Sequence, residues 1–198
     1  SEIEKYNLIR VDSTIVADTC NKLKEGIDQK SGKKLVKFSF SFDGILPSGV
    51  EVFTAQKYSS EESALPQAIL KHTLKEVGHD NIYVIDRGLQ STRTMKEFDK
   101  ESIKFIIRSK ENRKFEEIET YLDLENPLKW EDWGLVKDSK VKLFTGKPIL
   151  NKRGNIHHRE EKVETEFRLV IIKNEKTNKE FWFLTNEFEL SAKEITDY

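Results

Sequence analysis

The chain has 198 residues, of which 36% are hydrophobic and 35% are charged. This length suits one core of ordinary size with an insertion, and it is too short for two large domains. A single cysteine, Cys20, excludes an intrachain disulfide and any multi-cysteine metal cluster. The formal net charge of −1 argues against a strongly basic nucleic-acid-binding domain, so any such surface must be local.

The chain also lacks the features of a membrane or secreted protein. No apolar run approaches the roughly 20 residues needed to cross a bilayer. Its first five residues lack the basic and apolar regions of a signal peptide. We therefore expect a cytoplasmic protein in which Cys20 is a small buried side chain.

The first third of the chain is typical of strands. Residues 6–17 are dominated by β-branched and apolar side chains, which predicts a largely buried strand with Asp12 inside it. Residues 34–42 alternate phenylalanines with Lys37, Ser39 and Ser41, the pattern of a half-buried strand. Residues 50–58 resume strand character after a Gly/Pro loop, so the two segments predict an antiparallel hairpin.

A helix and two further strands follow. Apolar residues from Leu65 to Val77 recur near helical spacing, with Pro66 suited to a first turn and Gly78 to the cap. Residues 81–88 form an apolar strand that ends on Asp86, a helical stretch runs through Phe98, and residues 105–109 supply a fifth strand. This order predicts an α/β, ribonuclease-H-like mixed sheet with flanking helices.

The remaining segment consists of short strand-like pieces separated by polar turns. Residues 111–190 read as a β-rich insertion after a core at 1–110, with a hairpin of residues 167–172 and 181–185. Ser191 and Glu194 match a capping box, so a helix begins within residues 191–198. Because a helix of so few residues cannot offset its nucleation, we expect the chain to be a fragment of a longer protein.

Asp12 and Asp86 are the candidate catalytic and metal-binding residues. Carboxylates on neighbouring central strands can hold two hard divalent cations about 3.5 to 4 Å apart, which activate an attacking oxygen and stabilise a leaving oxygen at a phosphodiester. Asp12 lies among apolar residues, where an unpaired buried charge is costly. Asp86 ends an apolar strand before Gly88.

Other polar groups favour structural interpretations. Asp43 and Gly44 are typical of a turn. Glu164 and Glu166 alternate with apolar residues, as on the solvent face of a strand. His157 and His158 have no further ligand at metal spacing and favour a loop. Trp130 and Trp133 are interpreted as packing anchors.

Basic residues gather locally despite the near-zero net charge. Residues 139–159 contain no acidic residue, and we expect a phosphate-contacting surface there, made of Lys140, Lys142, Lys147, Lys152, Arg153 and Arg159. A second basic cluster spans residues 104–114, and residues 116–138 are strongly acidic. Arg87, beside Asp86, is expected near a scissile phosphate.

Three short blocks resemble the DDE transposases of bacterial insertion sequences: Asp-Ser-Thr at 12–14, Tyr-Val-Ile-Asp-Arg-Gly-Leu at 83–89, and the segment from Phe-Leu-Thr-Asn at 183 to Leu-Ser-Ala-Lys-Glu-Ile at 195. The resemblance implies that Asp12 and Asp86 are two of three metal ligands for Mg²⁺ or Mn²⁺. It also implies cleavage of transposon ends, strand transfer into target DNA, and a homodimer assembled on DNA.

The family's Tyr-x2-Arg-x3-Glu-x6-Lys block does not appear, except for a Tyr that Tyr198 would supply. The resemblance therefore places the catalytic Glu after Tyr198, and it implies that the 198-residue chain alone does not cleave DNA. Two alternatives stay open. One is a ribonuclease-H-like nuclease without strand transfer, and the other is a degenerate remnant that binds DNA without catalysis.

Overall fold

The computed structural model describes residues 5–17, 24–76 and 80–197. It divides into two compact units, Ser1–Leu89 and Gln90–Tyr198. The predictions made for Cys20, Val77, Gly78 and Tyr198 fall outside the described residues. Within the part that is described, no helix is long and apolar enough to span a membrane.

The strands of the first unit form an antiparallel group around β3 (Lys34–Asp43). It pairs with β1 (Asn7–Ala17), β4 (Leu46–Phe53) and the short β2 (Ile27–Asp28). The predicted hairpin is confirmed, but β4 starts earlier than expected. The reason is a tight turn in which Gly44 adopts a φ of 61°, so that Asp43 pairs directly with Leu46. Residues 56–58 form the 3-10 helix η2 (Gln56–Tyr58) rather than strand.

The face of β3 that carries the polar side chains is the buried one. Lys37 and Ser39 are each only 1% exposed, whereas the phenylalanines are half-buried. The ammonium group of Lys37 donates to the Ser59 carbonyl at 2.9 Å and pairs with Glu61 at 3.2 Å. The Ser39 hydroxyl bonds the Ser13 hydroxyl at 2.7 Å. The polar face is therefore buried because each of these polar groups has a partner.

Helix α1 (Glu61–Lys75) packs on that polar face and leads to β5 (Asn81–Ile85). The helix is confirmed, but it begins five residues before Pro66, so the proline lies inside it rather than in the first turn. Small buried residues, Ala64 and Ala68, suit close approach to the strands. Strand β5 pairs in parallel with β1, as a helical crossover requires.

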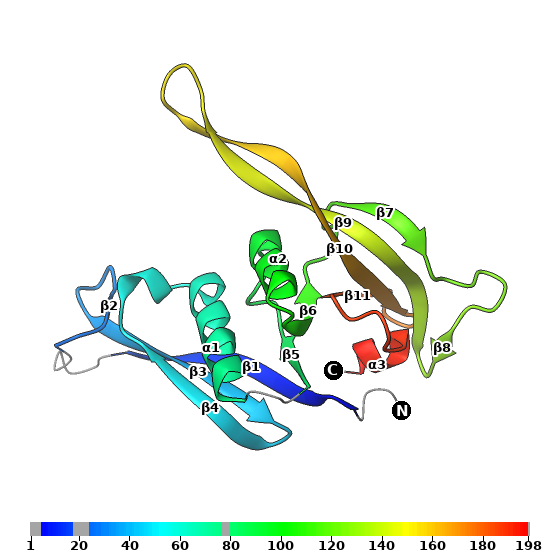
Figure 1. The fold of residues 1–198 in the computed structure, drawn as a ribbon, viewed down its shortest axis with the longest axis horizontal. Helices are drawn as coiled ribbons and strands as arrows, with labels where there is room; N and C mark the ends of the chain where they lie inside the picture. The colour runs from blue at the N-terminus through cyan, green and yellow to red at the C-terminus, as the bar shows by residue number, and fades with distance from the viewer. Residues whose placement is uncertain (1–4, 18–23, 77–79, 198) are drawn as a thin grey trace. The chain divides into compact units, whose positions relative to one another are not determined.

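The second unit contains α2 (Thr92–Lys100), an antiparallel sheet and α3 (Ala192–Thr196). Its strands are β6 (Lys104–Ser109), β7 (Phe115–Thr120), β8 (Lys129–Trp130), β9 (Trp133–Leu150), β10 (Ile156–Asn174) and β11 (Glu180–Thr185). They lie in the order β6-β11-β10-β9-β7, with β8 paired to β9 (Figure 1). Phe98, Phe105 and Phe167 pack together in its core.

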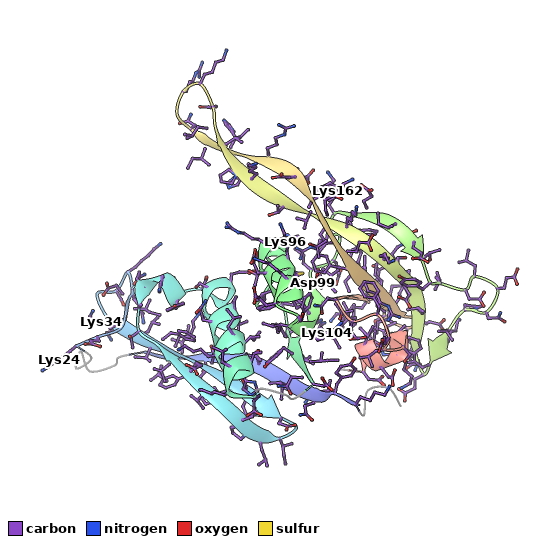
Figure 2. The ribbon with its side chains drawn as sticks, in the orientation of Figure 1. Lys24, Lys34, Lys96, Asp99, Lys104 and Lys162 are labelled. Carbon is purple, nitrogen blue, oxygen red and sulfur yellow. The ribbon has the colours of Figure 1, made fainter. Side chains whose placement is uncertain are left out.

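Two sequence predictions for this unit are confirmed. Strands β10 and β11 form the expected hairpin, with Ile172 paired to Phe181. The capping box of α3 is complete, because the Ser191 hydroxyl accepts from the Glu194 amide and the Glu194 carboxylate accepts from the Ser191 amide. Side chains of α2 and β6 also meet the segment after β11: Asp99 and Lys104, both labelled in Figure 2, bond Asn186.

Strands β9 and β10 continue well beyond their neighbours. Residues 145–162, called the arm below, form the distal part of this hairpin and close in a turn at residues 151–155. Figure 1 shows the arm projecting from the rest of the second unit. Almost every arm residue is exposed, which indicates that the arm has no core of its own.

Apart from the short strand β2 and the 3-10 helix η2, the order of elements through β6 is the one expected from the sequence: three strands, a helix, a strand, a helix and a strand. Antiparallel pairing of β1, β3 and β4, followed by the parallel pairing of β1 with β5, gives a mixed sheet with helices. The fold is α/β and ribonuclease-H-like. The β-rich segment begins after β6, which itself belongs to the second unit.

Candidate active site

Asp12 and Asp86 occupy matching positions on adjacent parallel strands. The register of β1 and β5 ends with Val11 opposite Ile85. Asp12 is the next residue of β1, and Asp86 is the first residue of the loop that continues β5. Neighbouring strands lie about 4.8 Å apart, and successive side chains alternate between faces. The register therefore brings the two carboxylates to the same face of the sheet as direct neighbours.

This face is the one opposite α1. Val11 and Ile85 are buried, at 5% and 2% exposed, as expected for residues directed toward the helix. Asp12 and Asp86 are exposed, as expected for their neighbours in an alternating pattern. The site is thus a pair of solvent-accessible carboxylates backed by a packed strand pair.

The expectation that Asp12 lies in a largely buried strand is wrong. Ile15 and Val16 are 51% and 54% exposed, so only the first half of β1 contributes to the core. The Ser13 amide donates to the Asp12 carboxylate at 2.8 Å. The position of Asp12 therefore rests on strand pairing rather than on a need to neutralise a buried charge.

An aromatic ladder flanks Asp12 on β3. Phe40 is the cross-strand partner of Asp12, and its ring stacks at 6.1 Å from Phe42 and 6.4 Å from Phe38. Cross-strand partners share a face. One side of the carboxylate pair is therefore bordered by the aromatic rings of β3.

Gly88 is a positioning residue that sequence reasoning did not single out. A Cβ at this position would lie 3.1 Å from a Leu65 methyl carbon and 3.3 Å from the Glu61 Cβ. A side chain at this position would require Leu65 and Glu61 to shift by a few tenths of an ångström, so glycine favours the close approach of the loop after Asp86 to the first turns of α1. The sequence shows a glycine two residues after Asp86, but the reason for it becomes clear only from the contact of this loop with α1. Arg87, between the two, is exposed.

Three of the six basic residues expected to contact phosphate are paired with glutamates, and the two at the root of the hairpin make the shorter contacts. Lys140 lies 3.3 Å from Glu119 and 3.6 Å from Glu166, and Lys142 lies 2.6 Å from Glu164. Hydrogen bonds to these glutamates raise the pKa of both lysines. The acidic strand β7 and the glutamates of β10 therefore neutralise the root of the hairpin.

The other four basic residues lie on the arm and are exposed: Lys147, Lys152, Arg153 and Arg159. Lys147 lies 3.8 Å from Glu161, and both side chains are more than half exposed. At such exposure an ion pair is weak. Positive charge thus persists at the end of the arm.

The structural interpretations of the remaining candidates are mostly confirmed. Asp43 borders the β3–β4 turn, and Glu164 and Glu166 are on the exposed face of β10. His157 and His158 are in strand β10 rather than in a loop, paired with Ile149 and Pro148 on opposite faces. Among the described residues, no group of three or more His, Cys, Asp or Glu is arranged to hold a metal ion. Asp12 and Asp86 therefore form a pair, not a complete set of ligands.

Comparison with known proteins identifies relatives of the chain. A family model described as "Transposase DDE domain" matches residues 4–198. Similar solved structures include the cryo-EM structure of the piggyBac transposase synaptic complex with hairpin DNA, with a TM-score of 0.46 and 12% sequence identity. The match covers 93% of this chain and 34% of that one, so the chain spans about a third of that protein's length. No curated protein matches the chain.

Proposed function

The chain belongs to the family of transposase DDE domains, and on that premise we propose that Asp12 and Asp86 are catalytic metal ligands of a DNA transposase. The observation that carries the proposal is their placement as same-face neighbours at the ends of the β1–β5 register. The proposed reactions are cleavage of transposon ends and transfer of the cut strand into target DNA.

The two carboxylates fit a divalent metal ion. Carboxylate oxygens are the ligands that Mg²⁺ and Mn²⁺ prefer, and both groups face solvent, where a DNA strand can reach them. When bound, such ions activate the attacking oxygen and stabilise the leaving oxygen at phosphorus. The remaining metal ligands are expected to come from residues other than Asp12 and Asp86.

The surrounding residues hold and orient the site. Pairing of β1 with β5 fixes the separation of the carboxylates, and Gly88 fixes the path of the loop after Asp86. Arg87, exposed beside Asp86, is positioned to donate to a phosphate oxygen at the scissile bond. The six basic residues of β9 and β10 named above are further candidates for contact with transposon-end or target DNA. A homodimer assembled on DNA and a cytoplasmic, nucleoid-associated location belong to the same proposal.

The test is a cleavage assay on the DNA that flanks the gene. Because the resemblance places the third carboxylate after Tyr198, the assay uses the protein encoded by the whole gene. This protein is incubated with Mg²⁺ and a donor plasmid that carries the gene and its flanking sequences, and cut ends and joined products are mapped. We expect cuts at discrete boundaries with the wild-type protein and none with Asp12→Asn or Asp86→Asn. Asp43→Asn is the matched control, because Asp43 is an exposed carboxylate of the same unit.

The outcomes separate the alternatives. Cuts without joined products support a nuclease, and binding without cuts supports a non-catalytic remnant. Cleavage that survives both Asp12→Asn and Asp86→Asn contradicts the assignment of the site.

A further inference from the structure

The arm carries a local excess of positive charge. From Lys147 to Arg159 there are four Lys or Arg residues and no acidic residue. Among the residues that the structure describes, none of the ion pairs involves Lys152, Arg153 or Arg159. Lys162, labelled on the arm in Figure 2, differs because it pairs with Glu116 at 3.0 Å. Within the two strands of the arm, the unneutralised charge therefore lies in the distal part.

One cross-strand pair of the arm joins like charges. Arg159 is the direct partner of Lys147 in the β9–β10 register. Like charges at opposed positions destabilise a strand pair. An anion bound between the two side chains would remove this repulsion, which points to a negatively charged partner for this face.

The turn at the end of the arm is built to present two cations. The Asn151 carboxamide oxygen accepts from the amides of Arg153 and Asn155, each at 2.9 Å. Gly154 takes a φ of 77°, which closes the turn without strain. Lys152 and Arg153 thus project from an ordered turn, so little backbone order has to be created on binding.

A basic pocket lies at the root of the arm. Its volume is about 510 Å³, and its lining includes Lys110, Arg113, Lys114, Phe144 and His158. The Arg113 guanidinium is held by donation to the Gln90 carbonyl at 2.6 Å and the Thr92 hydroxyl at 2.7 Å. Glu160, which pairs with Lys114, is the single carboxylate among the lining residues. Cations exceed carboxylates in this pocket, as they do at the tip.

We propose that the arm, from this root pocket to the turn at residues 151–155, is a docking surface for the sugar-phosphate backbone of duplex DNA. The proposal rests on the proposed function for the identity of its partner. Seven residues of one strand of the arm span roughly 23 Å. This length equals about seven nucleotide steps along one strand of a duplex. Exposed Leu150 and Ile156, cross-strand partners at the tip, supply apolar contact with the groove beside the phosphates.

The test measures the affinity of the full chain for a short labelled duplex of mixed sequence over a series of salt concentrations. The variant is Lys152→Ala/Arg153→Ala/Arg159→Ala. The matched control is Lys129→Ala/Lys176→Ala/Lys179→Ala, which removes the same charge from exposed positions at the other end of the β9–β10 hairpin. We expect the arm variant to weaken binding at least about tenfold and to lower the salt slope by about 0.9 for each lost contact. The control should bind as the wild type does.

Each other outcome has a defined meaning. If the wild-type chain binds duplex DNA and the arm variant binds equally well with the same salt slope, the arm proposal is overturned while the proposed function stands. If the wild-type chain binds no DNA, the proposed function also loses its support. A change in oligomeric state with unchanged DNA affinity would instead assign the arm to contact between copies of the chain and overturn the proposal.

Discussion

At the scale of single residues, the side chains of the first unit differ in how far the sequence predicted them. Asp12 and Asp86 could be selected because carboxylates on neighbouring central strands have a recognisable chemical use. The burial of Lys37 could not be predicted, since its partners Ser59 and Glu61 lie more than twenty residues away in the sequence. Alternation along β3 shows that two faces exist, but not which of them meets α1.

His72 makes the first unit sensitive to pH. It is 3% exposed, and its ring nitrogens bond the hydroxyls of Ser48 at 3.0 Å and Tyr83 at 2.9 Å. Burial lowers the pKa of His72 from the ordinary 6.5, assisted by Lys75 and opposed by Glu76 and Asp43. The unfolded chain therefore binds more protons than the folded one as the pH falls through 6.5, and stability is lost in that direction.

We expect the free energy of unfolding, measured by urea titration, to fall between pH 7.5 and 5.5 by at most about 1.4 kcal/mol per pH unit from this group. His72→Gln should reduce this dependence. His157→Gln, on the exposed arm, should retain it. Equal pH dependence in all three proteins would show that His72 is not the responsible group.

At the scale of elements, a buried ion pair holds the connection between β11 and α3. Arg168 on β10 makes two hydrogen bonds to Asp138 on β9, at 2.7 and 2.8 Å. Its guanidinium also donates to the carbonyls of Phe188 and Leu190. One side chain thus joins two strands to the segment that leads into the capped helix.

Removing Arg168 should be strongly destabilising, because the Asp138 carboxylate would remain buried without a counter-charge. We expect Arg168→Ala to lower the free energy of unfolding by about 3–5 kcal/mol. Lys176→Ala, which breaks an exposed pair with Asp132, should change it by about 0–1 kcal/mol. Denaturant titration of both variants checks the contrast, and similar small changes would refute a structural role for the buried pair.

At the scale of the whole molecule, local signals predicted the elements better than their partners. The order of strands and helices, the two hairpins and the capping box follow from short-range patterns and are confirmed. The charge pattern is different, because Lys140 and Lys142 meet glutamates from other parts of the chain. The absence of acidic residues from 139–159 therefore predicted too much positive charge at the root of the β9–β10 hairpin, where glutamates from other segments pair with the lysines. At the tip of the hairpin the predicted positive charge is present.

The same distinction applies to the candidate site. Each aspartate could be found from its own strand, but their neighbouring positions depend on parallel pairing of β1 and β5 across a helical crossover. The exposure of Asp12 could not be predicted, because it depends on where the core under β1 ends. Strand pairing thus supplies the geometry that the local pattern lacks.

The most direct test of the central claim is the binding of Mn²⁺ by the chain, measured by calorimetry at neutral pH. If Asp12 and Asp86 share a metal ion, Asp12→Asn and Asp86→Asn should each weaken binding by at least about tenfold, since affinity depends on the number of charged ligands. Asp43→Asn should bind as the wild type does. Mn²⁺ binding that is unchanged in both site variants would contradict the claim that these two carboxylates form a metal site.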